Sequence, residues 1–292
     1  MEEILELKNI SKKYQQKNGE TLALKDINLK LEKGEFVSII GPSGCGKSTL
    51  LSIISGLEEK TEGKIIIENE EVNGISSKIG YMLQKDCLLE WRTIFSNILF
   101  GLEIKGLKNA ENIGYAENLL KKYGLYEFKD KFPNQLSGGM RQRVALIRTL
   151  CVKPKILLLD EAFSALDYQT RIKVTEDIYN ILKKENISTI MVTHDITEAI
   201  SMGDRVVVLT QRPGTIKTIH DIDFEIENRT PLNCRETPIF SKYFNTLWKE
   251  LGVDEWRTKE ILKKTKSWQN ISSRKSNSSS SYFFRFVGNL SE

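Results

Sequence analysis

Cysteine is scarce in this sequence and shows no regular spacing. The four cysteines are Cys45, Cys87, Cys151 and Cys234, and no two of them form a CxxC pair. Zinc sites and disulfide frameworks need closely spaced or regularly paired cysteines, so this spacing argues against both. We therefore expect four reduced thiols.

Long apolar runs and charge of one sign are lacking as well. No stretch approaches the roughly 18 uninterrupted apolar residues of a membrane helix, and the amino terminus, MEEILELKNI, is acidic where a signal peptide is basic. We expect the chain to stay in the cytosol. The 43 Lys and Arg barely exceed the 39 Asp and Glu, and the resulting net charge of +4 gives little reason to expect nucleic acid as a partner. The 40% of hydrophobic residues allows a large core in one or two domains.

Short apolar segments predict an α/β fold. Residues 36–40 predict a strand, which is followed by a Gly-rich turn and then by a helix. The continuous apolar runs at 155–161, 188–195 and 204–210 are typical of strands buried on both faces of a mainly parallel sheet. A helical stretch separates the first two of these runs, and this alternation of strands and helices indicates an α/β domain.

Two other regions depart from this pattern. From about residue 84 to residue 154 helical periodicity takes over, which predicts a helical subdomain inserted into the sheet domain. Residues 5–14 and 23–35 alternate apolar and polar side chains, which predicts a pair of antiparallel strands ahead of the Gly-rich turn.

The end of the chain carries weaker signals. We expect a partly helical extension over residues 221–266, with an amphipathic helix at 238–252. Residues 267–292 are Ser-rich and low in complexity, so we expect them to be a disordered tail.

The segment GPSGCGKST, residues 41–49, fits the phosphate-loop pattern G-x-x-x-x-G-K-[ST] in its required strand and helix context. Its glycines let successive backbone N–H groups point inward and cradle phosphate oxygens, next to the positive end of the helix dipole. We expect Lys47 to reach the β- and γ-phosphates and the Ser48 hydroxyl to bind Mg²⁺. A mere Gly-rich turn is the alternative, and the flanking strand and helix argue against it.

Two carboxylates and a histidine follow predicted buried strands. Asp160, at the end of the run ILLLD, can hold the Mg²⁺ shell, and Glu161 beside it is placed to orient and polarise an attacking water. His194 follows the next predicted strand, from which its imidazole could reach the γ-phosphate. Taken alone, an acidic turn and a structural histidine would explain these residues. Beside a phosphate loop, we expect catalytic roles for Glu161 and His194.

The segment LSGGMRQR, residues 136–143, places a serine and two glycines at the start of a predicted helix. Ser137 can cap the helix, and Gly138 and Gly139 leave its N–H groups open to close approach by an anion. A chain that already has one phosphate cradle does not need a second one for the same nucleotide. We therefore expect this segment to contact a nucleotide held mainly by a different copy of the protein.

Together with SALD and THD, these motifs resemble those of the ATP-binding subunits of ABC transporters, over roughly residues 3–220. The resemblance implies an α/β fold with a P-loop NTPase (RecA-like) core, an antiparallel β subdomain and an inserted helical subdomain at about 84–154, in one ATPase domain over residues 1–220. It implies ATP and Mg²⁺ as cofactors. It also implies a head-to-tail dimer with two ATP molecules between the subunits.

The resemblance assigns roles in the phosphate loop and at the dimer interface. Residues matching the nucleotide-binding loop are Gly41, Pro42, Ser43, Gly44, Cys45, Gly46, Lys47, Ser48 and Thr49. Ser137, Gly138 and Gly139 match the signature motif, which contacts the γ-phosphate bound to the opposite subunit. Asp167 in SALD matches the loop that crosses the dimer interface.

Three further positions match residues of the family's catalytic site. Gln84 matches the glutamine that senses Mg²⁺ and water, so with Ser48 and Asp160 it completes the implied metal set. His194 matches the switch histidine. Tyr14 matches the aromatic residue that stacks on adenine, and simple packing at a strand end is the alternative for it.

Residues 88–106 and the segment DEAFSALD resemble the import ATPases of the nitrate, sulfonate and taurine group. That group often has Pro where this chain has Glu90, and importers of pyrimidine vitamin precursors are similar, so the cargo stays open. The resemblance implies a second copy or a paralogous ATPase subunit, an integral-membrane permease, indirectly a solute-binding protein, and a place at the cytoplasmic face of the membrane. Residues 84–95 would push on the permease, with Leu88, Leu89 and Trp91 as contacts unless they pack internally.

Other members of the wider family are weighed against this interpretation. Chromosome and repair ATPases insert long coiled coils between the phosphate loop and the signature, whereas fewer than about 100 residues without sustained heptads separate them here. Ribosome-associated types usually carry two cassettes, and this chain has one. A binding module without turnover would lack Glu161 or His194. Export shares the same chemistry, and only the Trp91 region and the lack of a membrane segment favour import.

Overall fold

The computed structural model describes residues 2–16 and 19–252. The predicted tail at 267–292 and the last part of the predicted extension lie outside these residues. The described residues up to Leu251 form one compact unit. Among the described residues no helix is long and apolar enough to cross a membrane.

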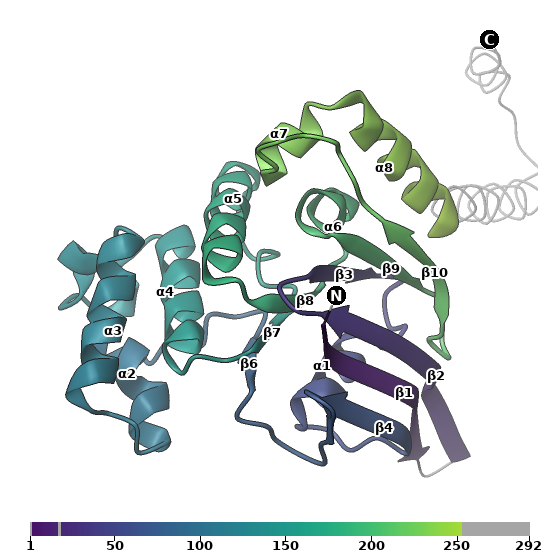
Figure 1. Ribbon diagram of the computed structural model, residues 1–292, viewed down its shortest axis with the longest axis horizontal. Helices are drawn as coiled ribbons and strands as arrows, with labels where there is room; N and C mark the ends of the chain where they lie inside the picture. The colour runs from purple at the N-terminus through teal and green to yellow at the C-terminus, as the bar shows by residue number, and fades with distance from the viewer. Residues whose placement is uncertain (1, 17–18, 253–292) are drawn as a thin grey trace, which may run out of the picture. The chain divides into compact units, whose positions relative to one another are not determined.

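A six-stranded sheet forms the centre of this unit (Figure 1). Its strands, in spatial order, are β10 (Ile216–Asp221), β9 (Arg205–Leu209), β3 (Phe36–Ile40), β8 (Ser188–Val192), β7 (Ile156–Asp160) and β6 (Ile79–Met82). The five strands from β9 to β6 are parallel, and β10 pairs antiparallel at one edge. The strands predicted at 36–40, 155–161, 188–195 and 204–210 are confirmed. The sequence did not reveal β6 and β10.

A second sheet, of order β2-β1-β4-β5, is antiparallel. It contains β1 (Glu3–Gln16), β2 (Gly19–Glu32), β4 (Glu62–Ile67) and the short β5 (Glu70–Glu71), so the predicted antiparallel pair is confirmed. Helix α1 (Lys47–Ser55) contributes Leu51 to a core that also contains Ile27 of β2 and Ile39 of β3. Because one core joins α1 to both sheets, the start of α1 is held firmly at the end of β3.

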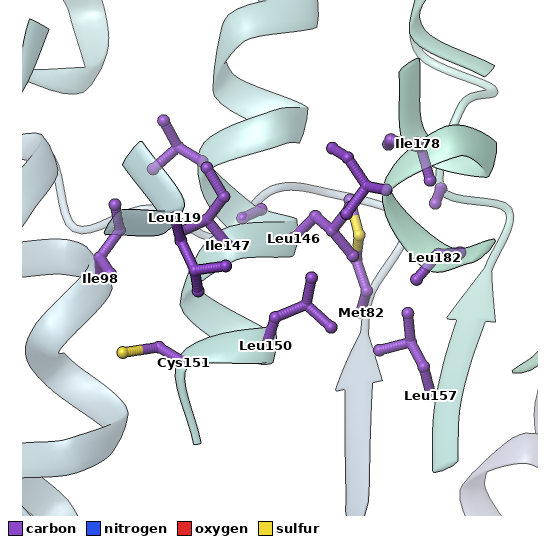
Figure 2. Close-up of a cluster of buried hydrophobic side chains, with 14 of the residues drawn as sticks. Met82, Ile98, Leu119, Leu146, Ile147, Leu150, Cys151, Leu157, Ile178 and Leu182 are labelled. Carbon is purple, nitrogen blue, oxygen red and sulfur yellow. The ribbon is translucent and has the colours of Figure 1, made fainter. Parts of the chain in front are cut away.

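The predicted helical region is confirmed between β6 and β7. It contains α2 (Ile94–Ile104), α3 (Ala110–Lys122), two 3₁₀ turns (Tyr126–Phe128 and Pro133–Gln135) and α4 (Gly138–Cys151). Figure 2 shows how it packs: Leu119 and Ile147 lie among its helices, while Leu146 lies near Met82 of β6 and Ile178 of α5 (Tyr168–Glu185). Helix α4 thus joins the helical region to the sheet.

The other helices in the described part of the chain are α6 (Ile196–Met202), α7 (Pro231–Arg235) and α8 (Pro238–Glu250). They share a separate apolar cluster, in which Ile200 of α6 packs with Cys234 of α7 and Leu247 of α8. The amphipathic helix predicted at 238–252 is therefore confirmed. Its apolar side covers α6, which begins one residue after Asp195 and so directly follows the His194 loop.

Candidate active site

The phosphate loop connects β3 to α1, as its pattern predicts. Gly44 and Gly46 have φ values of +74° and +106°, in the left-handed region where side chains are strained. A Cβ on Gly46 would also lie 2.7 Å from the Leu24 side chain. Glycine is therefore required at these positions for the backbone to turn into α1 with its first N–H groups unblocked.

A cavity of about 770 Å³ opens above this loop, within the range typical of small-molecule sites. The predicted residues that line it are Tyr14, Ser43, Gly44, Gly46, Lys47, Ser48, Thr49, Glu161 and His194. Thr21, Ala23 and Arg212 line it too, and the sequence did not reveal them. The cavity joins the antiparallel sheet, the phosphate loop and the ends of β7 and β8 into one site.

The Lys47 side chain lies along the loop and is almost fully buried. Its Nζ donates hydrogen bonds to the carbonyl oxygens of Gly41, at 2.8 Å, and Pro42, at 3.1 Å. The Cys45 side chain is buried in the core that α1 shares with both sheets, and burial raises the pKa of its thiol. Gly41, Pro42 and Cys45 can therefore serve the site only through their backbone and through Lys47.

Asp160, the last residue of β7, is hydrogen-bonded on both carboxylate oxygens. Oδ1 accepts a bond of 3.0 Å from the Ser48 hydroxyl, and Oδ2 accepts one of 3.1 Å from the Tyr81 phenol. Burial raises the pKa of Asp160, and burial together with the Asp160 charge raises the pKa of Tyr81 to about 12. The tyrosine therefore stays a hydrogen-bond donor at neutral pH.

These oxygen donors suit Mg²⁺, which binds hydroxyl and carboxylate oxygens and keeps much of its coordination for water and substrate phosphates. In the described part of the chain, no group of three or more His, Cys, Asp or Glu side chains could hold a metal by itself. The Ser48 and Asp160 pair thus fits a metal shared with a bound phosphate, and not an all-protein metal cage.

Glu161 meets two other predicted catalytic residues. Its Oε2 lies 3.2 Å from His194 Nδ1 and 3.5 Å from Gln84 Nε2. Gln84 follows β6, Glu161 follows β7 and His194 follows β8. Because these three strands are neighbours and parallel, all three residues lie at the carboxyl end of the sheet. Glu161 has a φ of +46°, a strained conformation for a residue other than glycine that is typical of functional positions.

Gln84 makes a second hydrogen bond, to a residue that the sequence did not single out. Its Nε2 donates a 3.1 Å bond to Ser164 Oγ, and Gln84 does not line the cavity. The structure therefore places the Gln84 amide within reach of both Glu161 and Ser164.

The signature residues lie at the start of α4 and do not line the cavity of their own chain. Ser137 caps the helix, accepting a 3.4 Å bond from Met140 N, and both Ser137 and Gly138 are exposed. Gly139 is buried, and a Cβ there would lie 2.7 Å from Val174 of α5. Gly139 is thus needed for the packing of α4 against α5. The sequence predicted an anion contact for both glycines and did not predict this packing role.

Asp167 caps α5 in the same way. Its carboxylate accepts a 3.1 Å bond from Thr170 N, and this hydrogen bond holds the pKa of Asp167 below its usual value. The residue is exposed, as a contact across a subunit interface requires.

The three residues predicted to contact a permease differ in exposure. Leu88 is buried in the core of the helical region, so it packs internally. Leu89 is half-buried, and Trp91 is 75% exposed. Of the three, Trp91 offers the largest apolar surface to a partner.

Two arginines of α4 bind the loop that connects β6 to α2. The sequence did not reveal this role. Arg141 donates to both oxygens of Asp86, at 2.8 and 3.1 Å, and to Glu90 at 2.7 Å. Arg148 donates to the carbonyl oxygens of Asp86 and Cys87, each at 2.7 Å. The signature helix and the loop before Trp91 are therefore tied together.

Comparison with known proteins agrees with this geometry. Residues 24–164 match the family model described as ABC transporter. An uncharacterised ABC transporter ATP-binding protein of Bacillus subtilis (strain 168) is 45% identical over 85% of this chain and 95% of its own length. A nitrate import ATP-binding protein of Synechocystis sp. is 40% identical over 82% of this chain and 91% of its own length.

This chain belongs to the ATP-binding proteins of ABC transporters. It is an ATPase with the fold of the ABC cassettes. Among solved structures, a bacterial ABC transporter cassette in dimeric form is 35% identical, with a TM-score of 0.65, and the match covers 75% of this chain and 99% of that one. A dimeric post-hydrolysis state of an ATP-binding cassette, bound to ADP and Pi, gives a TM-score of 0.64 at 34% identity, over 75% of this chain and 99% of that one.

Proposed function

We propose that this ABC ATPase is the ATP-hydrolysing subunit of an importer and works at the cytoplasmic face of the membrane. One observation carries the proposal: Gln84, Glu161 and His194 meet at the edge of the sheet, beside a cavity built on the phosphate loop. The relatives support import, since proteins 36 to 40% identical to this chain are named nitrate, taurine and aliphatic sulfonates import ATP-binding proteins.

ATP binding is assigned to the phosphate loop and the cavity rim. The N–H groups of residues 43–49 and the Lys47 ammonium hold the β- and γ-phosphates, and Tyr14 stacks on adenine. Ser48 and Asp160 hold Mg²⁺, which when bound neutralises charge on the phosphates. Lys47 already lies within the loop and needs only to exchange the Gly41 and Pro42 carbonyls for phosphate oxygens.

Hydrolysis is assigned to the cluster around Glu161. Its carboxylate takes a proton from water as the water oxygen forms a bond to the γ-phosphorus, and the bond from that phosphorus to the oxygen of ADP breaks. His194 contacts the γ-phosphate, and Gln84 helps to hold Glu161 and the water in line. No side chain is needed as a covalent nucleophile.

The exposed start of α4 supports a dimer of two copies, or of this chain with a paralogous subunit. Ser137 and Gly138 offer N–H groups that the cavity of their own chain does not use. In a head-to-tail dimer they contact the γ-phosphate held by the opposite subunit, and Asp167 lies at the interface.

The loop around Trp91 is assigned to contact with integral-membrane permease subunits. Trp91 is a large exposed apolar side chain seven residues after Gln84, which contacts Glu161, so one loop connects the hydrolysis cluster to the proposed permease contact. We infer a small cargo of the nitrate, sulfonate or taurine kind, delivered by a separate solute-binding protein. The names of the relatives support this cargo class.

The mechanism is tested with the Glu161→Gln variant. We expect wild-type protein to hydrolyse ATP, and the variant to lose turnover by at least about 100-fold and to accumulate as an ATP-bound dimer in light scattering. Glu62→Gln, at an exposed carboxylate of β4, is the matched control and should behave as wild type. Normal turnover by Glu161→Gln would show that another group activates the water.

The cargo is tested by uptake. Cells that lack the chain are given labelled nitrate, taurine or an alkanesulfonate, and are complemented with wild type or with Lys47→Ala. We expect one of the three to enter only with the wild-type protein. Equal uptake of all three in the deleted and complemented cells would reject this cargo class without touching the ATPase assignment.

A further inference from the structure

Tyr81 is a half-buried tyrosine on β6, and no motif includes it. Its strand pairs in parallel with β7, and side chains alternate between the two faces. Met82 joins the core of the helical region, and a Cβ on Gly80 would meet Thr149 of α4. Tyr81 therefore points to the opposite face, toward α1 and the phosphate loop.

The Tyr81 phenol lies between two elements of the site. It donates to Asp160 Oδ2 at 3.1 Å, and Ser52 of α1 also lies close to it. Ser52 is one helical turn after Ser48, whose hydroxyl donates to the other oxygen of Asp160 at 3.0 Å. The Asp160 carboxylate is thus held from both sides, by α1 on one oxygen and by β6 on the other.

We propose that Tyr81 is a positioning residue for the metal site: its hydrogen bond fixes the Asp160 carboxylate so that Oδ1 faces the Ser48 hydroxyl. This inference rests on the proposed binding of Mg²⁺ by Ser48 and Asp160. Rotation of a carboxylate about its last torsion is otherwise weakly restricted, so loss of the phenol would let the two oxygens exchange positions. Partners of this kind, which hold a metal ligand without touching the metal, typically change metal affinity by about 10- to 100-fold when removed.

The test uses Tyr81→Phe, which keeps the ring and removes only the hydroxyl. Tyr123→Phe is the matched control, because Tyr123 is also half-buried and donates to a carboxylate, but that carboxylate belongs to Glu185 and not to Asp160. Both changes are made in the full chain carrying Glu161→Gln, so that ATP is not consumed. Binding of a fluorescent ATP analogue is measured in EDTA and then against free Mg²⁺ concentration.

We expect Tyr81→Phe to raise the half-saturating Mg²⁺ concentration by about 10-fold or more, with unchanged affinity for the analogue in EDTA. Tyr123→Phe should match the parent in both measurements. A Mg²⁺ requirement within about 2-fold of the parent, or an equal shift in Tyr123→Phe, would overturn the role of Tyr81 alone. Absence of any Mg²⁺ effect in the parent protein would overturn the proposed metal site as well.

Discussion

The phosphate loop and the signature segment use the same elements, a serine and glycines at the start of a helix, yet the fold surrounds them differently. At the phosphate loop, Gly44 and Gly46 adopt left-handed backbone conformations below a cavity that Glu161 and His194 complete. At the signature, Ser137 and Gly138 are exposed, and that cavity does not include them. One helix start has Glu161 and His194 in the same cavity, and the other helix start lies outside that cavity.

The comparison teaches that similar local sequence does not give similar local chemistry. The phosphate loop lies at the carboxyl ends of parallel strands, where ligands of α/β sheets bind. The start of α4 lies in the helical region, and its buried glycine, Gly139, packs closely against Val174 of α5. In the proposed dimer, the exposed start of α4 from a second subunit would complete the site.

The largest effect should come from the phosphate loop. Lys47→Ala removes the one ammonium buried along the loop between Gly41 and the cavity, so we expect ATP turnover to fall by about 1000-fold or more and ATP binding to be lost. Lys64→Ala, which removes an exposed lysine paired with Glu71, should leave both unchanged. Titration with a fluorescent ATP analogue measures the binding, and retention of wild-type affinity by Lys47→Ala would contradict the assignment of the loop.

The two signature glycines should separate interface chemistry from packing. In Gly138→Ala the new Cβ lies 3.1 Å from Leu166 Cδ2 at an exposed position, so we expect a stable monomer that binds ATP but dimerises poorly, with turnover about 10- to 100-fold lower. In Gly139→Ala the Cβ lies 2.7 Å from Val174, so we expect the free energy of unfolding to fall by about 1–2 kcal/mol.

Denaturant unfolding and ATP-dependent light scattering of the two variants distinguish these effects. If Gly138→Ala dimerised normally with ATP, the start of α4 would not be part of the second half of the site.

The residues at the carboxyl ends of the parallel strands were easier to predict from the sequence than the other residues of the site. The phosphate loop, Asp160, Glu161 and His194 were predictable because parallel strands bring their carboxyl ends to one edge, so residues after separate apolar runs converge there. Gln84 was found only through the family resemblance, because the four-residue strand before it, β6, gave no clear apolar run.

Residues that reach the site through contacts between distant segments of the chain could not be predicted from the sequence. Arg212 lies in the turn between β9 and β10, and this turn meets β2 through a 2.9 Å bond from Gly214 N to Ala23 O. Arg141 and Tyr81 likewise act through contacts with residues 55 and 79 positions away. Such pairs follow from tertiary packing, and neither periodicity nor local motifs encode them.

A smaller effect should come from removing the ion pairs that connect α4 to the loop before Trp91. Arg141→Met breaks the bonds to Asp86 and Glu90, so we expect about 1–2 kcal/mol less stability and faster amide hydrogen exchange over residues 86–91. Arg143→Met, two residues along the same helix and similarly exposed, should leave that exchange unchanged. Unchanged exchange in Arg141→Met would show that the loop is held without it.

The pH dependence of this tie follows from Asp86. Burial alone would raise the pKa of Asp86, but hydrogen bonds from Arg141 hold it below the usual 3.8. Since the folded pKa is the lower one, the stabilisation is complete above pH 3.8 and is lost as the pH falls through the folded value. The difference in stability between wild type and Arg141→Met should therefore be constant near neutral pH and shrink in acid.

The smallest effect should come from Arg212, which brings a cation to the cavity from outside both motifs. Its guanidinium is exposed and donates to the Gly44 carbonyl at 3.0 and 3.2 Å, so solvent weakens its attraction to a bound nucleotide. We expect Arg212→Ala to weaken ATP binding by about 2- to 5-fold, Arg212→Lys to retain most of the affinity, and Gln211→Ala to have no effect. If high salt left the difference between wild type and Arg212→Ala unchanged, the arginine would act by shaping the loop and not by its charge.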